Sequence, residues 1–585
     1  MRELITVDES KCVGCNACVR TCPASEANVT KMLDDGRFVT TVNYDRCIAC
    51  GECVRNCAHG ARDYHDDCEV AMERVMKGVP FIVIAAPAIK TVFPENWKSV
   101  LMWFKEHGCA VYDVSFGADI CTWAHLRAVQ RGLCSHIISQ PCAAIVRYIE
   151  LYQSGLVKNL SPIHSPMLCL VTYLKKYQNR KEPILALSPC VAKKNEFLET
   201  GLVDYNVTFK KMKKYFESHN ITISADRDMA NFVFPFDGEQ GQVGAIYPRP
   251  GGLRDNLWLH DPNLNITTAE GVHKVYPELD MYAKLIDDMK PEVFDVLSCE
   301  YGCNVGPGTP GDKTVFDAMH TMRRAEASAK SMRKTTGMLF FRGAEDKLFK
   351  RFDDALHLTD FIRTYDASNS VQTISDAELE ETFNSMGKHT EEERHYDCHA
   401  CGYKSCHDMA VAIYKGLNVP QNCIVNAKRI LSEQFLAMQE SHGALVDVTG
   451  ECKTLSNQLV NDVENILLNV DSISGSTQNV AVLSGKVKEL IDKLINICNN
   501  VDHMDAEHLK GLALLLGNTN VAFSELAQSV DMSVQDCEII KSRTDEIREL
   551  VDRINETLSD TVDENAETYA KSGSLPMSMM LSQLQ

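Results

Sequence analysis

The sequence predicts an α/β core, preceded by a small cysteine-rich α+β module and followed by an all-α antiparallel coiled-coil hairpin. Three observations predict this fold class. Strand-like and helical patterns alternate in the middle of the chain, cysteines crowd its beginning, and heptads dominate its end. With 585 residues the chain has room for three or four cores. Changes in composition divide it into residues 1–75, 76–370, 371–432 and 433–585.

The first region carries two cysteine runs of the form C-x2-C-x2-C-x3-C, at residues 12–22 and 47–57. Such runs supply three thiolates to one iron–sulfur cube, and the fourth cysteine of each run serves the other cube. Zinc prefers closed four-thiolate sets without this interleaving, so two [4Fe–4S] clusters are expected. The expected ligand sets are Cys12, Cys15, Cys18 and Cys57 for one cluster, and Cys47, Cys50, Cys53 and Cys22 for the other.

The second region alternates short apolar runs with amphipathic stretches. "FIVIAAPAI", "CAVYDVSF" and "PILALSP" are typical of buried strands, whereas "WKSVLMWFKEHG" and "TYLKKYQNR" are typical of helices. This alternation predicts a parallel sheet covered by helices.

The third region ends in a second kind of cysteine cluster, spaced C-x2-C-x4-C-x16-C. Four thiolates can hold either zinc or a [4Fe–4S] cluster, and spacing alone does not decide between them. We favour iron–sulfur because the chain already carries such clusters. The residues concerned are Cys398, Cys401, Cys406 and Cys423.

The last region has apolar residues at alternate three- and four-residue steps, which is the coiled-coil pattern. One seam runs from Leu459 to Val501 and a second from Phe523 to Leu558, and Gly511 and Gly517 lie between them. We expect the chain to reverse near these glycines and to form an antiparallel hairpin about 60 Å long, at ~1.5 Å per residue. An ordinary helical bundle is the alternative. The cysteines here, Cys452, Cys498 and Cys537, are expected to be seam or surface residues rather than ligands.

Four cysteines of the second region stand at predicted strand ends or in loops, although they are far apart in sequence. Loops at the ends of strands are where an α/β scaffold gathers side chains onto one cofactor. These cysteines are therefore candidate ligands of a shared cofactor: Cys142, Cys190, Cys299 and Cys303.

The segments that hold these cysteines, "QPC", "LSPCVAKKNE" and "VLSCEYGCNVGPGTP", resemble the three signature segments of the [FeFe]-hydrogenase catalytic domain. "IAAPAIK", "DVSFGAD", "HSPM" and "FDDALHLTDF" are further matches. The resemblance spans residues 76–370, and the module before it resembles a bacterial two-cluster ferredoxin. The fold class thus becomes an α/β hydrogenase core with an N-terminal ferredoxin-like module and a C-terminal helical hairpin.

The resemblance implies an H-cluster, in which a [4Fe–4S] cube is joined to a di-iron unit bearing CO and cyanide. By resemblance, Cys142, Cys190 and Cys299 bind the cube. Cys303 bridges it to the di-iron unit. The implied reaction is H2 ⇌ 2H+ + 2e−, and the implied partners are H2, protons and an electron carrier such as ferredoxin.

The resemblance also assigns roles around the cofactor. Lys193 is expected to donate a charged hydrogen bond to a cyanide, because an ammonium is a strong donor. Pro87 and Ala88 would present backbone around the other cyanide. Ser165 would line the pocket.

The sequence departs from the family pattern where protons are relayed. Pro141 replaces a cysteine that relays protons in catalytic members, and proline has no exchangeable side-chain proton. Ala124 and His125 stand where catalytic members carry acidic residues. His125 could substitute as a relay, although a structural role is the alternative. Cys121 and Cys169 are further relay candidates, although we favour a role as buried packing residues for both.

Ser188 and Leu297 replace methionines that usually precede two of the cysteine ligands, and Met167 stands where a glutamine is common. Such changes alter hydrogen bonding and polarity around a cofactor. A positioned proton relay contributes about 10²–10⁴ in rate, so slow turnover is expected. Slow chemistry joined to a helical tail suggests an H2 or redox sensor. The alternatives are a ferredoxin-linked catalytic hydrogenase and a non-catalytic iron–sulfur scaffold.

Composition sets the remaining expectations. The net charge of −20 disfavours sequence-independent binding to nucleic acid, which needs a basic surface. No apolar run is long enough to span a membrane, and the N-terminus lacks a signal-peptide pattern, so a cytoplasmic location is expected. The tail resembles the cytoplasmic hairpin of chemotaxis receptors, without a recognisable tip sequence. It predicts a homodimer and a signalling protein as partner.

Overall fold

The computed structural model describes residues 3–226, 233–335, 347–367, 374–500 and 505–573. The chain forms two compact units, Met1–Ala427 and Lys428–Gln585. The finer division into four regions stays a prediction. No helix among the described residues is both long and apolar enough to cross a membrane.

The cysteine-rich module at the N-terminus consists of two antiparallel strand pairs, β1 with β4 and β2 with β3. A single helical turn lies within each cysteine run. The elements are β1 (Ile5–Val7), α1 (Ala17–Arg20), β2 (Asn28–Met32), β3 (Phe38–Val42), α2 (Glu52–Arg55) and β4 (Arg62–Tyr64).

Two parallel sheets form the α/β core, as predicted from the alternation of patterns. One has the strand order β6-β5-β8-β9 and the other β10-β11-β7. Strands β5 and β8 are apolar and fully buried because they lie inside a sheet that is covered by helices. The strands are β5 (Ile82–Ala85), β6 (Ala110–Asp113), β7 (Ile137–Ile138), β8 (Ile184–Ser188), β9 (Tyr205–Thr208), β10 (Ile266–Glu270) and β11 (Val293–Leu297).

Helices of moderate length surround these sheets. Two of them, α6 and α8, pack unusually closely: a Cβ at Gly117 would lie 2.2 Å from the carbonyl oxygen of Pro166. The helices of this part are α3 (Cys68–Met76), α4 (Ile89–Val92), α5 (Trp97–Glu106), α6 (Val114–Gln130), α7 (Ala143–Tyr152), α8 (Pro166–Lys176), α9 (Lys193–Thr200), α10 (Phe209–Ser218), α11 (Gly252–Trp258), α12 (Val275–Tyr282), α13 (Val315–Thr335) and α14 (Lys347–Ala355).

The third region is a small helical domain. Ser375 and Thr390 each cap a helix with a full capping box. Its helices are α15 (Asp376–Ser385), α16 (Glu391–Arg394) and α17 (Cys406–Tyr414).

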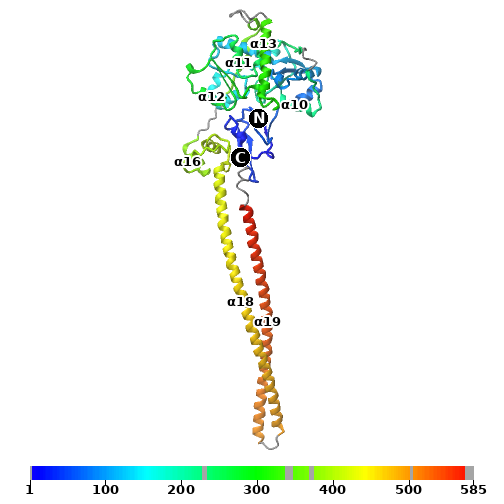
Figure 1. The fold of residues 1–585 in the computed structure, drawn as a ribbon, viewed down its shortest axis with the longest axis vertical. Coiled ribbons are helices and arrows are strands. Elements are labelled where there is room, and N and C mark those ends of the chain that lie inside the picture. The colour runs from blue at the N-terminus through cyan, green and yellow to red at the C-terminus, as the bar shows by residue number, and fades with distance from the viewer. Residues whose placement is uncertain (1–2, 227–232, 336–346, 368–373, 501–504, 574–585) are drawn as a thin grey trace. The chain divides into compact units, whose positions relative to one another are not determined.

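The second unit is an antiparallel pair of long helices, α18 (Ile424–Asn499) and α19 (Ala506–Gly573), which lie side by side in Figure 1. Ion pairs fix the register, since Asp471 pairs with Lys541 and Glu464 pairs with Arg548. The predicted hairpin is therefore confirmed. It is longer than expected, because the 76 residues of α18 span about 115 Å at ~1.5 Å each.

The predicted reversal point is wrong. Both Gly511 and Gly517 lie inside α19, which begins at Ala506. Glycine lowers helix propensity without forbidding a helix, and four leucines lie between these two glycines. The rest of the predicted turn, residues 501–504, lies outside the described residues.

Half of the predicted heptad seam is also wrong. Val463, Val470 and Ile491 of α18 are buried, as are Val530, Cys537 and Val551 of α19. The alternate seam positions are exposed: Leu459, Ile466, Ile473, Val480, Leu494, Leu526, Ile540, Ile547 and Ile554. The heptad spacing identifies two apolar edges on each helix, but it does not show which edge packs against the partner helix.

Candidate active site

The carboxyl ends of four strands from both parallel sheets meet at one cavity. The residues just after β5, β7, β8 and β11 line a cavity of about 100 Å³. In α/β sheets, ligands bind beyond the carboxyl ends of the strands. The structure brings all four predicted cysteines to this cavity: Cys142, Cys190, Cys299 and Cys303.

Glycines let the loop that carries two of these cysteines fold tightly. Gly302 has a φ of +79°, and a Cβ there would lie 2.3 Å from the carbonyl oxygen of Pro248. A Cβ at Gly308 would lie 2.6 Å from the carbonyl oxygen of Pro189, beside Cys190. Only glycine fits such close approaches, which explains the glycines in "YGCNVGPG".

Three of the four thiols lie in a low-dielectric setting. Burial raises the pKa of Cys190 to about 11 and that of Cys303 to about 12, and neighbouring cysteines add to both effects. Burial also raises the pKa of Cys299 well above its usual range. Metal ligation requires thiolates, so assembly of a cluster here must release the protons of these thiols. A convergent set of four cysteines fits an iron–sulfur centre.

Lys193 lies at this cavity as predicted, and it forms a buried ion pair that the sequence analysis missed. Its Nζ donates to Glu196 Oε2 at 2.5 Å. Ser165 Oγ donates to the same oxygen at 3.0 Å, and Arg363 Nη1 donates to Oε1 at 3.3 Å. A Lys and a Glu three residues apart on a helix resemble a surface pair, so only their burial distinguishes them. Arg363 is far from Glu196 in the sequence, so no sequence pattern around Glu196 predicts their contact.

The other predicted pocket residues divide between the cavity wall and the layer behind it. Pro87, Ala88, Pro141, Met167 and Leu297 line the cavity. Ser165 lies behind the cavity wall and bonds Glu196, so its predicted place in the lining is not observed.

Ser188 also lies behind the wall, where it holds the Cys190 loop. Its hydroxyl donates to Asn206 Oδ1 at 2.6 Å, and Asn206 Nδ2 donates to the carbonyl of Cys190 at 3.1 Å. The family pattern that the sequence resembles has a methionine at this position. Ser188 instead supplies a hydroxyl group that forms hydrogen bonds.

The relay candidate His125 is completely buried and does not line the cavity. Its Nε2 lies 2.8 Å from Ser161 Oγ and its Nδ1 lies 2.8 Å from the carbonyl oxygen of Cys121. Both ring nitrogens are thus engaged, which suits a structural histidine. Its role as a relay stays a prediction.

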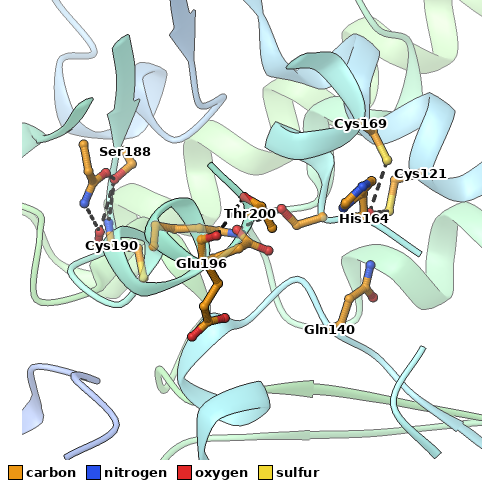
Figure 2. A network of polar contacts seen from close by, with 12 residues as sticks. Cys121, Gln140, His164, Cys169, Ser188, Cys190, Glu196 and Thr200 are labelled. Carbon is orange, nitrogen blue, oxygen red and sulfur yellow. Dashed lines mark hydrogen bonds and ion pairs between the residues drawn. The ribbon is translucent and has the colours of Figure 1, made fainter. Parts of the chain in front are cut away.

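Cys169 donates to the carbonyl oxygen of His164 at 3.2 Å, and Cys121 Sγ lies 3.3 Å from the same oxygen. Burial alone would raise the pKa of Cys121, but Cys169 and the imidazole of His125 lower it to about 5. Neither thiol lines the cavity. Figure 2 shows them with His164 on one side of Glu196, and the Cys190 loop on the other.

The N-terminal cysteines are arranged as the interleaved spacing predicts for one of the two sets. Cys22 joins Cys47, Cys50 and Cys53 around a cavity of about 20 Å³. Arg62, which the sequence analysis did not single out, is buried between the two runs: its Nη2 donates to Cys18 Sγ at 3.3 Å and to Asn28 Oδ1 at 2.9 Å. The ligand assignments of Cys12, Cys15, Cys18 and Cys57 stay predictions.

The third cysteine set also converges. Cys398, Cys401, Cys406 and Cys423 line one small cavity. This domain packs directly on the first cysteine run, since Asn422 bonds Asn16 and a Cβ at Gly402 would lie 2.8 Å from Val19 Cβ.

The second cysteine run packs in turn on the central site. A Cβ at Gly51 would lie 2.7 Å from Pro307 Cβ, next to the Cys303 loop. Burial raises the pKa of Tyr276, and Cys50 and Cys142 both add to the effect, which places these two cysteines near one side chain. The cysteine sets therefore follow one another through direct contacts within the first unit.

Comparison with protein families agrees with this geometry. Residues 79–307 match the model of the iron only hydrogenase large subunit, C-terminal domain. This region is similar to iron-only hydrogenases and is called the hydrogenase domain. Residues 11–61 match a 4Fe-4S dicluster domain, and residues 395–425 match an Fe-S cluster domain. The predicted cofactors are thereby confirmed, including iron–sulfur rather than zinc in the third cysteine set.

Solved structures of hydrogenases are similar in part. The apo [FeFe]-hydrogenase HydA1 from Chlamydomonas reinhardtii, in a variant form, is 13% identical, with a TM-score of 0.38. The match covers 51% of this chain and 99% of that one. An [FeFe]-hydrogenase structure that concerns oxygen inactivation is 13% identical over 52% of this chain and 100% of that one, with a TM-score of 0.37. No curated protein matches the chain.

The hydrogenase domain fits the H-cluster of its family by the chemistry of its donors. When bound, that cofactor supplies an iron site for H2 and a route for two electrons. The chain's own residues supply four thiols, an ammonium at the cavity wall and a lining that is apolar apart from Tyr247 and Ser298. The individual ligand roles stay predictions.

Proposed function

We propose that the hydrogenase domain activates H2 reversibly, H2 ⇌ 2H+ + 2e−, at the cavity shared by its four cysteines. The carrying observation is the meeting of these cysteines with Lys193 at one cavity between two sheets. Cys142, Cys190 and Cys299 hold the cube, and Cys303 carries the bridge.

Turnover at this site is slow. Pro141 lines the cavity where a proton-relaying cysteine is expected, and it can neither donate nor accept a proton through its side chain. A positioned proton relay increases the rate by about 10²–10⁴. A site without such a relay in its cavity wall therefore binds H2 but turns it over slowly.

Electrons leave through the iron–sulfur sites of the first unit. Contacts from Gly51 to Pro307 and from Gly402 to Val19 support a route from the central site through the ferredoxin-type clusters to the four-cysteine domain. A soluble electron carrier such as ferredoxin is the proposed redox partner.

The helical hairpin is the output module of an H2 or redox sensor. A long coiled coil is poorly suited to bind a metabolic substrate, but it can present a surface to a signalling protein. The alternative is a ferredoxin-linked hydrogenase in which the hairpin serves oligomerisation alone. Both readings keep the chain in the cytoplasm.

The hairpin pairs with a second copy of this chain. On both helices, the exposed apolar residues follow buried ones by three positions, as Ile473 follows Val470 and Ile540 follows Cys537. Because the helices are antiparallel, the same rotation carries both exposed stripes to one side of the hairpin. That side is about 50 Å long and about 20 Å wide, which provides the ≈ 800 Å² per partner of a stable interface.

Infrared spectroscopy of the anaerobically matured protein tests the proposal. Cofactor CO and cyanide bands that change between argon and H2, together with slow turnover on the same sample, are expected. Fast turnover would favour the catalytic alternative. Complete maturation without any such bands would leave only an iron–sulfur scaffold.

A further inference from the structure

Behind Lys193, a second and much larger cavity opens on the surface of the first unit. It has a volume of about 1120 Å³ and is lined mainly by polar residues. Glu196 lies between the two cavities without lining either one. Its side chain is only 2% exposed.

The two oxygens of Glu196 face different partners. Oε2 accepts from Lys193, which lines the cofactor cavity, and from Ser165 beside its wall. Oε1 accepts from Arg363, which lines the outer cavity. The carboxylate therefore separates the cofactor cavity from the outer one.

Three further side chains at the outer cavity carry polar atoms that lack a protein partner among the described residues. They are His164 Nδ1, Asn195 Oδ1 and Arg363 Nε. Buried polar atoms of this kind are normally satisfied by ordered water. A polar cavity of this volume has ample room for such water.

We propose that Glu196 carries protons between the cofactor cavity and water in the outer cavity, by a longer and slower route than the cysteine relay that Pro141 cannot provide. Lys193, which lines the cofactor cavity, passes a proton from its ammonium to Oε2, and Glu196 becomes neutral. A proton from the cofactor cavity restores the ammonium of Lys193. The carboxyl group of Glu196 then turns about its Cγ–Cδ bond and releases its proton to water in the outer cavity, which restores the carboxylate. Arg363 stays protonated throughout and only orients Oε1, because a guanidinium does not deprotonate in proteins.

The charged and titratable groups around Glu196 suit this role. Lys193 and Arg363 both donate to Glu196, and Arg363 Nη2 also donates to Glu199 Oε2 at 3.2 Å. His164, Cys169 and Tyr365 face Glu196 from the remaining sides. Burial lowers the pKa of His164 to about 4, so this imidazole is neutral at pH 7 and adds no positive charge.

The inference rests on the proposed H2 activity, and its test separates the two. The full chain, carrying all its clusters, is compared with Glu196→Gln, Glu196→Ala and the exposed control Glu73→Gln. Infrared difference spectra between H2 and argon report both the cofactor bands and the C=O band of a protonated carboxyl group. We expect the carboxyl band in the parent and in Glu73→Gln, and its loss in Glu196→Gln.

The rate at which the cofactor bands respond to H2 should fall about a hundredfold in Glu196→Gln, at the lower end of the usual proton-transfer effect. Added formate should restore part of that rate in Glu196→Ala, because the outer cavity admits a small acid. A merely structural role of Glu196 would give no rescue.

Two outcomes overturn the inference. A parent whose cofactor bands ignore H2 overturns the proposed function, and the relay with it. A responding parent whose Glu196→Gln variant responds equally fast and keeps the carboxyl band overturns the relay alone. Unchanged iron–sulfur absorption in each variant shows that the protein has folded.

Discussion

In the first unit, the apolar side chains near the cofactor cavity are buried within one chain, whereas the hairpin leaves half of its heptad positions in water. Val83, Ile84 and Leu187 are completely buried, but Ile473 is 55% exposed and Val470, three residues away, is 5% exposed. The first unit buries its apolar core within one chain. In the proposed dimer the hairpin supplies half of an interface, so the proposals place function at the cavity in one chain and function at the hairpin in two.

Removing a cofactor ligand should abolish cofactor binding at the cavity of the first unit. Cys303→Ala deletes the thiol that is proposed to bridge the two parts of the H-cluster, so the CO and cyanide bands should be absent after maturation. The ferredoxin-type clusters use other cysteines and should keep their EPR signals.

Cys134→Ala is the matched control, because Cys134 is partly buried and does not line the cavity. Its infrared bands should equal those of the parent. Normal bands in Cys303→Ala would remove Cys303 from the ligand set.

Two neighbouring residues of α18 test the second half of the comparison. Val470→Asp places a charge in the buried seam and should destabilise the hairpin by about 3 kcal/mol or more. Ile473→Asp places the same charge on the exposed stripe and should leave the helix content intact while lowering the dimer fraction. Circular dichroism during thermal unfolding and sedimentation equilibrium of the full chain measure the two effects.

Equal effects of both substitutions on helix content would show that the stripe belongs to the intramolecular seam. A parent that sediments as a monomer at every concentration would contradict the proposed dimer.

Low pH should weaken the first unit through His164. Burial lowers the pKa of His164 to about 4, whereas an unfolded histidine titrates near 6.5. The unfolded state therefore binds the extra proton between these values, so stability is full above about pH 6.5 and falls as pH drops towards 4. The loss approaches about 3 kcal/mol, at 1.36 kcal/mol per pKa unit.

Urea unfolding of the parent and of His164→Gln across pH 4–7 measures this dependence. The variant should lose less stability than the parent on acidification. Parallel pH profiles would show that another group dominates the acid response.

The cysteines of the cavity could be predicted from the sequence because thiolate chemistry leaves local traces. Cys190 and Cys299 each follow a buried strand by two residues, and glycines and prolines surround them. No comparable sequence pattern predicts the contact between Glu196 and Arg363. Their pairing depends on two segments that meet only in the fold, and a Lys–Glu spacing of three is common on exposed helices.

The hairpin shows the complementary limit. Heptad spacing predicted the long helices and their pairing, because burial of one apolar edge requires that period. Two edges with the same period cannot be told apart by spacing. The turn was misplaced for a related reason, since glycine marks both turns and weak points of helices.

The smallest prediction concerns that misplaced turn. Gly517 lies inside α19, and a Cβ at this position would meet no other atom within 4 Å. Gly517→Ala should therefore stabilise the hairpin by about 0.5–1 kcal/mol, because alanine loses less backbone entropy in a helix. Gly511→Ala should act in the same direction, for the same reason. Thermal unfolding followed by circular dichroism measures both changes. If the chain instead reversed at these glycines, a turn that needs positive φ would make both substitutions destabilising, so the sign of the change alone locates the turn.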